Sequence, residues 1–354
     1  MEQWLVDLCR LARARGHSLH LFIHEPVHSE IAVELSGLGI GWTRMEELEA
    51  APLQWSRRLR RDFDVFYLNL VAPRGRAALA GYLAWPLPVL FFEGTSGRAP
   101  WSPDRSLMGR ILDPLTFIRV AGLAGASRYV VERDRIRFKY PVRRSTVIYN
   151  GVDVARFHPP AARTHRRPML VAVANLIREK GLDVLLEACQ SLQQLDWTLR
   201  IVGDGPEEPR LRSQAEANGL SGRVEFLGLR DDVERVLQES DIYVHPAVWD
   251  EAFGLTIAEA MACECATLAT RAGGIPEIVE DGVSGLLVPP GDSVALAAAL
   301  RRLLEDGALR ARLAQAGRKR IAERFTLEAS VSGQLDWIER AGKPNQEAFP
   351  TKAR

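Results

Sequence analysis

The chain has 354 residues, about twice the usual length of a domain, so it can form two domains that each bury a core. Hydrophobic residues make up 47% and charged residues 26%, which excludes wholesale disorder and a polytopic membrane protein. The net charge of +1 hides 22 cationic against 16 acidic residues within residues 1–160 and the opposite sign beyond them, and we expect no nucleic-acid partner.

Several classes of segment are absent from the sequence. The longest apolar run, residues 77–92, is broken by Pro86 and Pro88 and is shorter than the roughly 20 residues of a membrane-spanning helix. The four cysteines are scattered, which favours a reducing compartment over a disulfide framework. No cationic start precedes an apolar core at the N-terminus, so we expect cytoplasmic localisation.

The first part of the chain alternates helices with short apolar runs. An amphipathic helix is expected to end near Gly16, a residue suited to a left-handed C-terminal cap. Strands are then expected at residues 19–23, 39–44, 65–70, 89–93, 129–132 and 146–149. Short apolar runs between helices indicate a parallel sheet covered on both faces.

A second series of the same kind follows a Pro/Arg/His-rich stretch, residues 158–168, which is typical of a linker. Its strands are expected at residues 169–174, 198–202, 224–227, 242–245, 266–269 and 285–288, with helices at 182–192 and 255–262 among them. The fold class is therefore α/β, with two doubly wound Rossmann-like domains and a ligand cleft at the carboxyl ends of their strands. We expect domains at 1–160 and 161–326, a final helix at 327–341 that packs back toward the first domain, and a polar tail at 342–354.

The most informative stretch is residues 245–277. A strand ends at His245, a loop carries Glu251, and a helix begins around Gly254, whose free N–H groups and dipole suit a diphosphate. Glu259 lies about one turn into that helix, so one carboxylate can reach a sugar's hydroxyls and the other a ribose. The residues alone leave open that both are surface glutamates beside a helix.

This stretch resembles the signature of the retaining family 4 glycosyltransferases, which have the GT-B fold. The resemblance rests on the spacing Glu251-x7-Glu259 around Phe253-Gly254-Leu255 and on the later Gly-Gly-Ile-Pro-Glu at 273–277. Further blocks that resemble the family in order and spacing are residues 150–153 with Phe157, 174–181, 203–206, 224–228 and 281–288. The resemblance covers nearly the whole chain.

The resemblance implies a role for each matching position. Glu251 would bind the donor sugar's hydroxyls and Glu259 the ribose, while Lys180, with Arg178, would neutralise the leaving diphosphate. The other implied donor-binding positions are Asn175, Gly203, Leu229 and the backbone of Phe253, Gly254 and Leu255. The implied reaction moves a sugar, with retention and without a metal or cofactor, from a nucleotide diphosphate sugar to the hydroxyl of an acceptor glycan or glycolipid held by the first domain.

The sequence departs from the family pattern in three places. Ala174-Asn175 stands where the family commonly has Gly-Arg, and Glu93 stands where it often has a histidine, so Glu93 is a candidate catalytic group. The family's first strand and Gly-Gly loop are also missing, which should expose the apolar face of the first helix. We therefore expect either a start assigned too late or a fragment of impaired activity.

Three alternatives remain to be weighed. A catalytically impaired GT-B protein that acts as a binding subunit is the main one, and a nucleotide-sugar epimerase is disfavoured by the Glu-x7-Glu block. The run His24-Glu25-Pro26-Val27-His28 matches the H-E-x-x-H zinc pattern, but Pro26 removes the required helix, so we expect no metal site.

Basic residues cluster at Arg57, Arg58, Arg60 and Arg61, and again at 133–139. They could seat the first domain on an anionic bilayer, as a peripheral protein, or bind an anionic acceptor. A solvated helix face explains them about as well.

Overall fold

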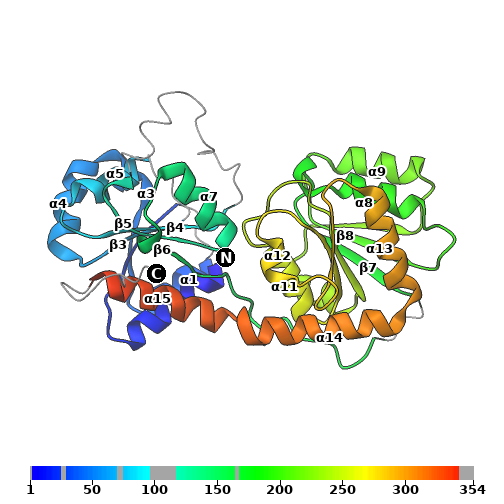
Figure 1. Cartoon of the computed structure of the whole chain (residues 1–354). Helices are drawn as coiled ribbons and strands as arrows, with labels where there is room; N and C mark the ends of the chain where they lie inside the picture. Colours follow the sequence, from blue (N-terminus) through cyan, green and yellow to red (C-terminus); the bar gives the residue numbers. More distant parts are fainter. Residues whose placement is uncertain (1, 25–28, 70–74, 96–116, 164–166, 343–354) are drawn as a thin grey trace. The chain divides into compact units, whose positions relative to one another are not determined.

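The computed structural model describes residues 2–24, 29–69, 75–95, 117–163 and 167–342. They form two compact units, the first made of Met1–Tyr149 with Leu327–Arg354 and the second of Asn150–Thr326 (Figure 1). The chain thus changes unit between Tyr149 and Asn150, and the described part of the expected linker at 158–168 belongs to the second unit.

The second unit is built on a six-stranded parallel sheet in the order β12-β11-β10-β7-β8-β9. Its strands are β7 (Met169–Val173), β8 (Thr198–Val202), β9 (Val224–Gly228), β10 (Ile242–His245), β11 (Ala266–Thr270) and β12 (Leu286–Val288). Relabelled within the unit, this order is 3-2-1-4-5-6, the doubly wound arrangement. Its order reverses between β7 and β10, and this place is called the switch point below.

Helices cover the second sheet on both faces (Figure 1). They are η2 (Arg178–Lys180), α8 (Leu182–Gln190), α9 (Glu208–Ala217), α10 (Val233–Gln238), α11 (Leu255–Ala262), α12 (Ile275–Ile278), α13 (Ser293–Glu305) and α14 (Gly307–Arg324). Alternate residues of the strands face the core, where Ile242 and Val244 of β10 pack with residues such as the fully buried Trp197.

The first unit contains two parallel sheets, a four-stranded one in the order β3-β4-β5-β6 and the pair β1-β2. The strands are β1 (His20–Ile23), β2 (Gly41–Arg44), β3 (Phe66–Asn69), β4 (Val89–Glu93), β5 (Val120–Gly125) and β6 (Ser145–Val147). The helices are α1 (Glu2–Ala14), α2 (Ser29–Gly37), α3 (Met45–Ala50), α4 (Pro52–Asp62), α5 (Arg76–Leu83), α7 (Arg128–Phe138), η1 (Val142–Arg144) and α15 (Leu327–Gly342).

The apolar face of α1 is covered, not exposed as the missing strand led us to expect. Leu8 and Ala12 of α1 form a small core with Val331 and Leu335 of α15. Arg15 reinforces this contact through an ion pair with Asp336 at 2.6 Å. Helix α15 therefore covers the apolar face of α1 (Figure 1).

One strand expected from the sequence is wrong. Residues 129–132 lie in helix α7, because Ser127 caps its start and accepts a hydrogen bond from the backbone N–H of Val130 at 3.2 Å. The strand in this region is β5, whose sequence Val-Ala-Gly-Leu-Ala-Gly contains two glycines and so has weak strand propensity. None of the described helices is long and apolar enough to cross a membrane.

Candidate active site

The candidate site of the second unit lies at the switch point. Strand β7 ends at Val173 and leads into the loop that carries Lys180, while β10 ends at His245 and leads into the loop that carries Glu251. Neighbouring parallel strands end at the same sheet edge, and their following loops diverge where the strand order reverses. Polar side chains from the two loops therefore meet at one place.

Two cationic or donor groups converge on one oxygen of Glu251. Lys180 Nζ lies 2.5 Å from Glu251 Oε1, and His245 Nε2 lies 3.2 Å from the same atom. The three residues are mostly buried, with 22%, 12% and 4% of the Lys180, Glu251 and His245 side-chain surfaces exposed. The second oxygen, Oε2, has no hydrogen-bond partner within the described residues, so it can accept a hydrogen bond from a ligand.

The charge of Glu251 follows from these contacts. Burial by itself would raise the pKa of this carboxyl, but hydrogen bonds and charge from His245 and Lys180 outweigh it and hold the pKa at about 2. Glu251 is therefore a carboxylate at neutral pH and acts only as an acceptor.

Two glycines bring the backbone of neighbouring loops against the Glu251 loop. Gly181 has φ +63°, and a Cβ there would lie 2.1 Å from the carbonyl oxygen of Pro246. Gly273 has φ +56°, and a Cβ there would lie 2.2 Å from the carbonyl oxygen of Glu251, which also accepts the Gly274 N–H at 2.8 Å. Any side chain at either glycine would push the loop and displace the carboxylate.

The start of α11 supplies backbone donors beside this carboxylate. Gly254, at φ +98°, is the N-cap, and the first amides of the helix have no partner inside it. The side chain of Phe253 is 2% exposed and packs on Phe325 with ring centroids 5.7 Å apart, so only its backbone can face a ligand. This helix start suits an anion.

Glu259 lies on α11 and is partly buried. Desolvation raises its pKa to about 7, with a smaller opposing effect from Arg156, whose guanidinium pairs with Glu234 at 2.8 Å. No hydrogen-bond partner of the Glu259 carboxyl is found in the described part of the chain. Its two oxygens can thus bind the hydroxyls of a ligand.

The remaining positions that the sequence associates with the donor lie on the segments that follow β7, β8 and β9. A Cβ on Gly203 would lie 2.0 Å from the carbonyl oxygen of Ala174, so the turn at Gly203 packs directly on the loop of Asn175, whose side chain is exposed. The Arg178 side chain is 80% exposed, and its Nε lies 3.4 Å from Glu207 Oε1. Leu229 follows β9 and is 71% exposed.

Glu93 belongs to the first unit, at the end of β4, and is not part of the cluster at the switch point. It is 3% exposed, and its carboxylate accepts hydrogen bonds from the backbone N–H of Thr95, at 2.8 Å, and from the Thr95 hydroxyl. The side chain is thus already fixed by its own loop.

Within the part of the chain that the structure describes, no group of three or more His, Cys, Asp or Glu side chains is arranged to hold a metal ion. In the H-E-x-x-H run, residues 25–28 lie outside the described residues, and His24 Nδ1 lies 2.8 Å from Glu46 Oε1. The segment 96–116 and the tail 343–354 are also outside them.

Two contributors to the site have no role in the sequence prediction. His245 closes a central strand directly before the Glu251 loop, and this placement is the signal that points to it. The Asp250 carboxylate accepts the Gly273 N–H at 3.0 Å and so joins the two loops.

Comparison with known proteins agrees with this architecture. Residues 153–320 match the family model Glycosyl transferases group 1, and residues 1–156 match Glycosyltransferase Family 4. The lipopolysaccharide core biosynthesis glycosyltransferase LpsE of Rhizobium meliloti is 32% identical over 194 residues, which are 55% of this chain and 54% of LpsE. The chain spans about half the length of the curated relatives it matches.

Solved structures cover more of the chain. A glycosyltransferase from Rickettsia africae has a TM-score of 0.79 at 20% identity and covers 97% of this chain and 95% of its own. Anabaena Alr3699/HepE, solved in complex with UDP, has a TM-score of 0.77 at 22% identity and covers 96% and 95%. These structures show that the chain has the GT-B fold, and the two family matches, which together span residues 1–320, show that it belongs to the group 1, family 4 glycosyltransferases.

Proposed function

We propose that this protein transfers a sugar from a nucleotide diphosphate sugar to the hydroxyl of an acceptor glycan or glycolipid, with retention at the anomeric carbon and without a metal. The observation that carries the proposal is the Lys180–Glu251–His245 cluster beside the start of α11. A carboxylate acceptor, a lysine ammonium and helix-start amides together suit a sugar attached to a diphosphate.

Lys180 and the start of α11 provide the positive charge that the reaction needs. The leaving nucleoside diphosphate gains negative charge as the glycosidic bond breaks, and Lys180 and the first amides of α11 stabilise that charge. Glu251 Oε2 holds the sugar through its hydroxyls, and Glu259 holds the ribose. The structural neighbour HepE was solved with UDP bound, which supports a nucleotide donor.

The test is an assay of turnover with a panel of nucleotide sugars, in which release of the nucleoside diphosphate is measured. Glu251→Gln and Lys180→Ala should each lower kcat/KM by about two orders of magnitude. Lys319→Ala and Glu323→Gln are matched controls, because these residues are exposed and pair with each other at 3.8 Å on α14. Equal turnover in the site variants and the controls would refute the site.

The same assay addresses the finer parts of the proposal. Activity should persist in excess EDTA, and NMR of the first product formed should show the donor's anomeric configuration. Loss of activity in EDTA, or an inverted product, would overturn the corresponding part. Donor binding without transfer to any acceptor would favour the binding-subunit alternative.

Glu93 and the Arg-rich helix α4 belong to the first unit, which we propose holds the acceptor. For Glu93 we propose contact with the acceptor hydroxyl, and Glu93→Gln should then lower transfer to the acceptor more than hydrolysis of the donor. A proportional fall in both rates would point instead to the Glu93–Thr95 contact as purely structural.

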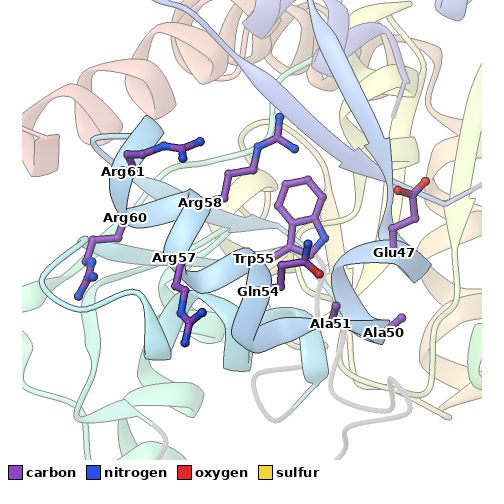
Figure 2. Close-up of a pocket in the computed structure, with 9 residues that line it drawn as sticks. All are labelled: Glu47, Ala50, Ala51, Gln54, Trp55, Arg57, Arg58, Arg60 and Arg61. Carbon is purple, nitrogen blue, oxygen red and sulfur yellow. The ribbon is translucent and has the colours of Figure 1, made fainter.

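A pocket of about 1030 Å³ lies along α3 and α4, and Figure 2 shows its lining side chains. Arg57, Arg58, Arg60 and Arg61 project from α4 in different directions, while Ser56 and Leu59 face the core. Arg57 and Arg60 have no ion-pair partner among the described residues. The outward spread of four cations suits a broad anionic surface better than a small ligand, so we include peripheral contact with an anionic membrane in the proposal.

The membrane contact is tested by sedimentation with vesicles. Binding to vesicles with about a third phosphatidylglycerol should exceed binding to pure phosphatidylcholine and should fall at high salt. Arg57→Gln with Arg60→Gln should reduce it, while Arg301→Gln with Arg302→Gln on α13 should not. Equal binding by both double variants would exclude α4 as the contact.

A further inference from the structure

Strand β10 carries two polar side chains on one face although it lies inside the sheet. Tyr243 and His245 are 0% and 3% exposed, and they alternate with the core residues Ile242 and Val244. Strands buried on both faces normally consist of apolar residues. A buried phenol and imidazole are tolerated only where they have hydrogen-bond partners.

The partners form a continuous chain that ends at Glu251. The hydroxyls of Thr256 and Tyr243 are 2.7 Å apart, Tyr243 Oη is 3.1 Å from His245 Nδ1, and His245 Nε2 is 3.2 Å from Glu251 Oε1. The Tyr243 and His245 rings are stacked at 6.2 Å with 24° between their planes. This hydrogen-bond chain thus links the first turn of α11 to the carboxylate at the switch point.

The ionised carboxylate fixes the proton on one imidazole nitrogen. Because Glu251 only accepts, His245 Nε2 must donate. When Nδ1 carries no proton, it accepts from the Tyr243 hydroxyl, which accepts from Thr256. When Nδ1 is protonated, it donates to Tyr243, both hydroxyls rotate, and Tyr243 donates to Thr256. Every side chain keeps its hydrogen bond in both arrangements, so His245 can gain a proton without breaking this series of hydrogen bonds.

This property matters because Lys180 has two possible partners. It pairs with Glu251 in the present structure, and in the proposed reaction it turns to the diphosphate. Glu251 would then remain in a desolvated position without the charge of Lys180. His245, on the same oxygen, is placed to keep the carboxylate ionised and its Oε2 directed at the sugar.

We propose that His245, backed by Tyr243 and Thr256, is a positioning residue for Glu251 and replaces Lys180 as its counter-charge when the diphosphate binds. The inference rests on the proposed function of Glu251 as the residue that binds the donor sugar. The titratable groups that act on Tyr243 are Glu259, Glu251 and Cys265, and Lys180 acts on Glu251.

Binding measurements separate positioning from a structural role. His245→Leu should weaken UDP-glucose binding about tenfold in calorimetry, the loss of one hydrogen bond to a charged group. It should weaken UDP binding by a smaller factor, because UDP draws Lys180 from Glu251 but has no sugar to bind Oε2. His245→Gln, whose amide can donate to Glu251 but carries no charge, should restore part of the affinity. His20→Leu, at a partly buried histidine of the first unit, is the control.

The outcomes distinguish the inference from the proposed function. Equal loss of UDP and UDP-glucose binding in His245→Leu, or no rescue by glutamine, would overturn the positioning role. If Glu251→Gln also leaves UDP-glucose binding unchanged, the proposed function of Glu251 fails. If Glu251→Gln weakens binding and His245→Leu does not, only the positioning role of His245 fails.

A measurement without ligand tests the proton assignment directly. Nitrogen-15 NMR of the imidazoles, with His245→Gln for assignment, should show His245 protonated at Nε2 at pH 7. Lys180→Ala should increase the fraction of His245 that is protonated at both nitrogens. A proton on Nδ1 alone, or no change in Lys180→Ala, would overturn the inference even if UDP-glucose does not bind.

Discussion

Glu259 shows how one buried carboxyl can make stability depend on pH. Its pKa is about 7 in the folded protein and near 4.5 when unfolded, because burial disfavours its charged form. Between those values the folded state holds a proton that the unfolded state has lost. The contribution to stability is therefore fully present below about pH 4.5 and is lost as the pH rises to about 7.

Glu259→Gln should remove this pH dependence. Relative to the wild type, the variant should gain about 2–3 kcal/mol of unfolding free energy between pH 4.5 and pH 8, since its amide does not ionise. Chemical denaturation at both pH values measures the difference, with Glu323→Gln on α14 as an exposed control. The same difference at both pH values would contradict the raised pKa.

At the scale of residues, the sequence could predict the types of the site residues and their spacing, but not which side chains contact one another. The spacing of Glu251 and Glu259 indicated two carboxylates at a helix start, and the structure places Lys180 against Glu251. The His245 contact depends on how the loop after β10 turns back on its own strand. No local pattern determines that turn, because glycines far along the chain, at 181 and 273, shape it.

At the scale of elements, capping competed with strand propensity. The β-branched run after Tyr129 favours a strand, but Ser127 places a helix N-terminus directly before it. Strand β5 escaped detection because its neighbours β4 and β6, not its own residues, stabilise it. The apolar strands of the second unit were predicted to within a residue or two.

Ser127→Ala tests the cap. The variant should lose about 1 kcal/mol of stability in the first unit, because the Val130 N–H loses its partner. Ser36→Ala, which removes an exposed hydroxyl inside α2, should change stability much less. Thermal denaturation of both variants gives the comparison, and equal shifts would mean that the cap does not stabilise α7.

At the scale of the whole molecule, two separate cores imply two unfolding events. Each unit buries its own apolar cluster, and all contacts of the candidate donor site described above lie within the second unit. A ligand that binds one unit stabilises that unit by mass action. The sequence predicted two doubly wound domains, but not the strand order or the pairing of α1 with α15, which depend on long-range packing.

Calorimetry of the intact chain should therefore show a selective effect of UDP. Saturating UDP should raise the transition of the second unit by several degrees and leave that of the first nearly unchanged. Lys180→Ala should reduce the shift. A single transition that moves as a whole would show that the units unfold together.

The two ends of the second unit are joined by the Val152–Thr326 bridge and a 2.9 Å hydrogen bond from the Val152 N–H to the Phe325 carbonyl. In topological terms the second unit is an insertion into the first, with neighbouring entry and exit points. Such an arrangement is the one that tolerates domain exchange and circular permutation. The second unit of a relative could thus be grafted between Tyr149 and Leu327. If the proposed function holds, this graft would combine that relative's sugar specificity with the first unit of this chain.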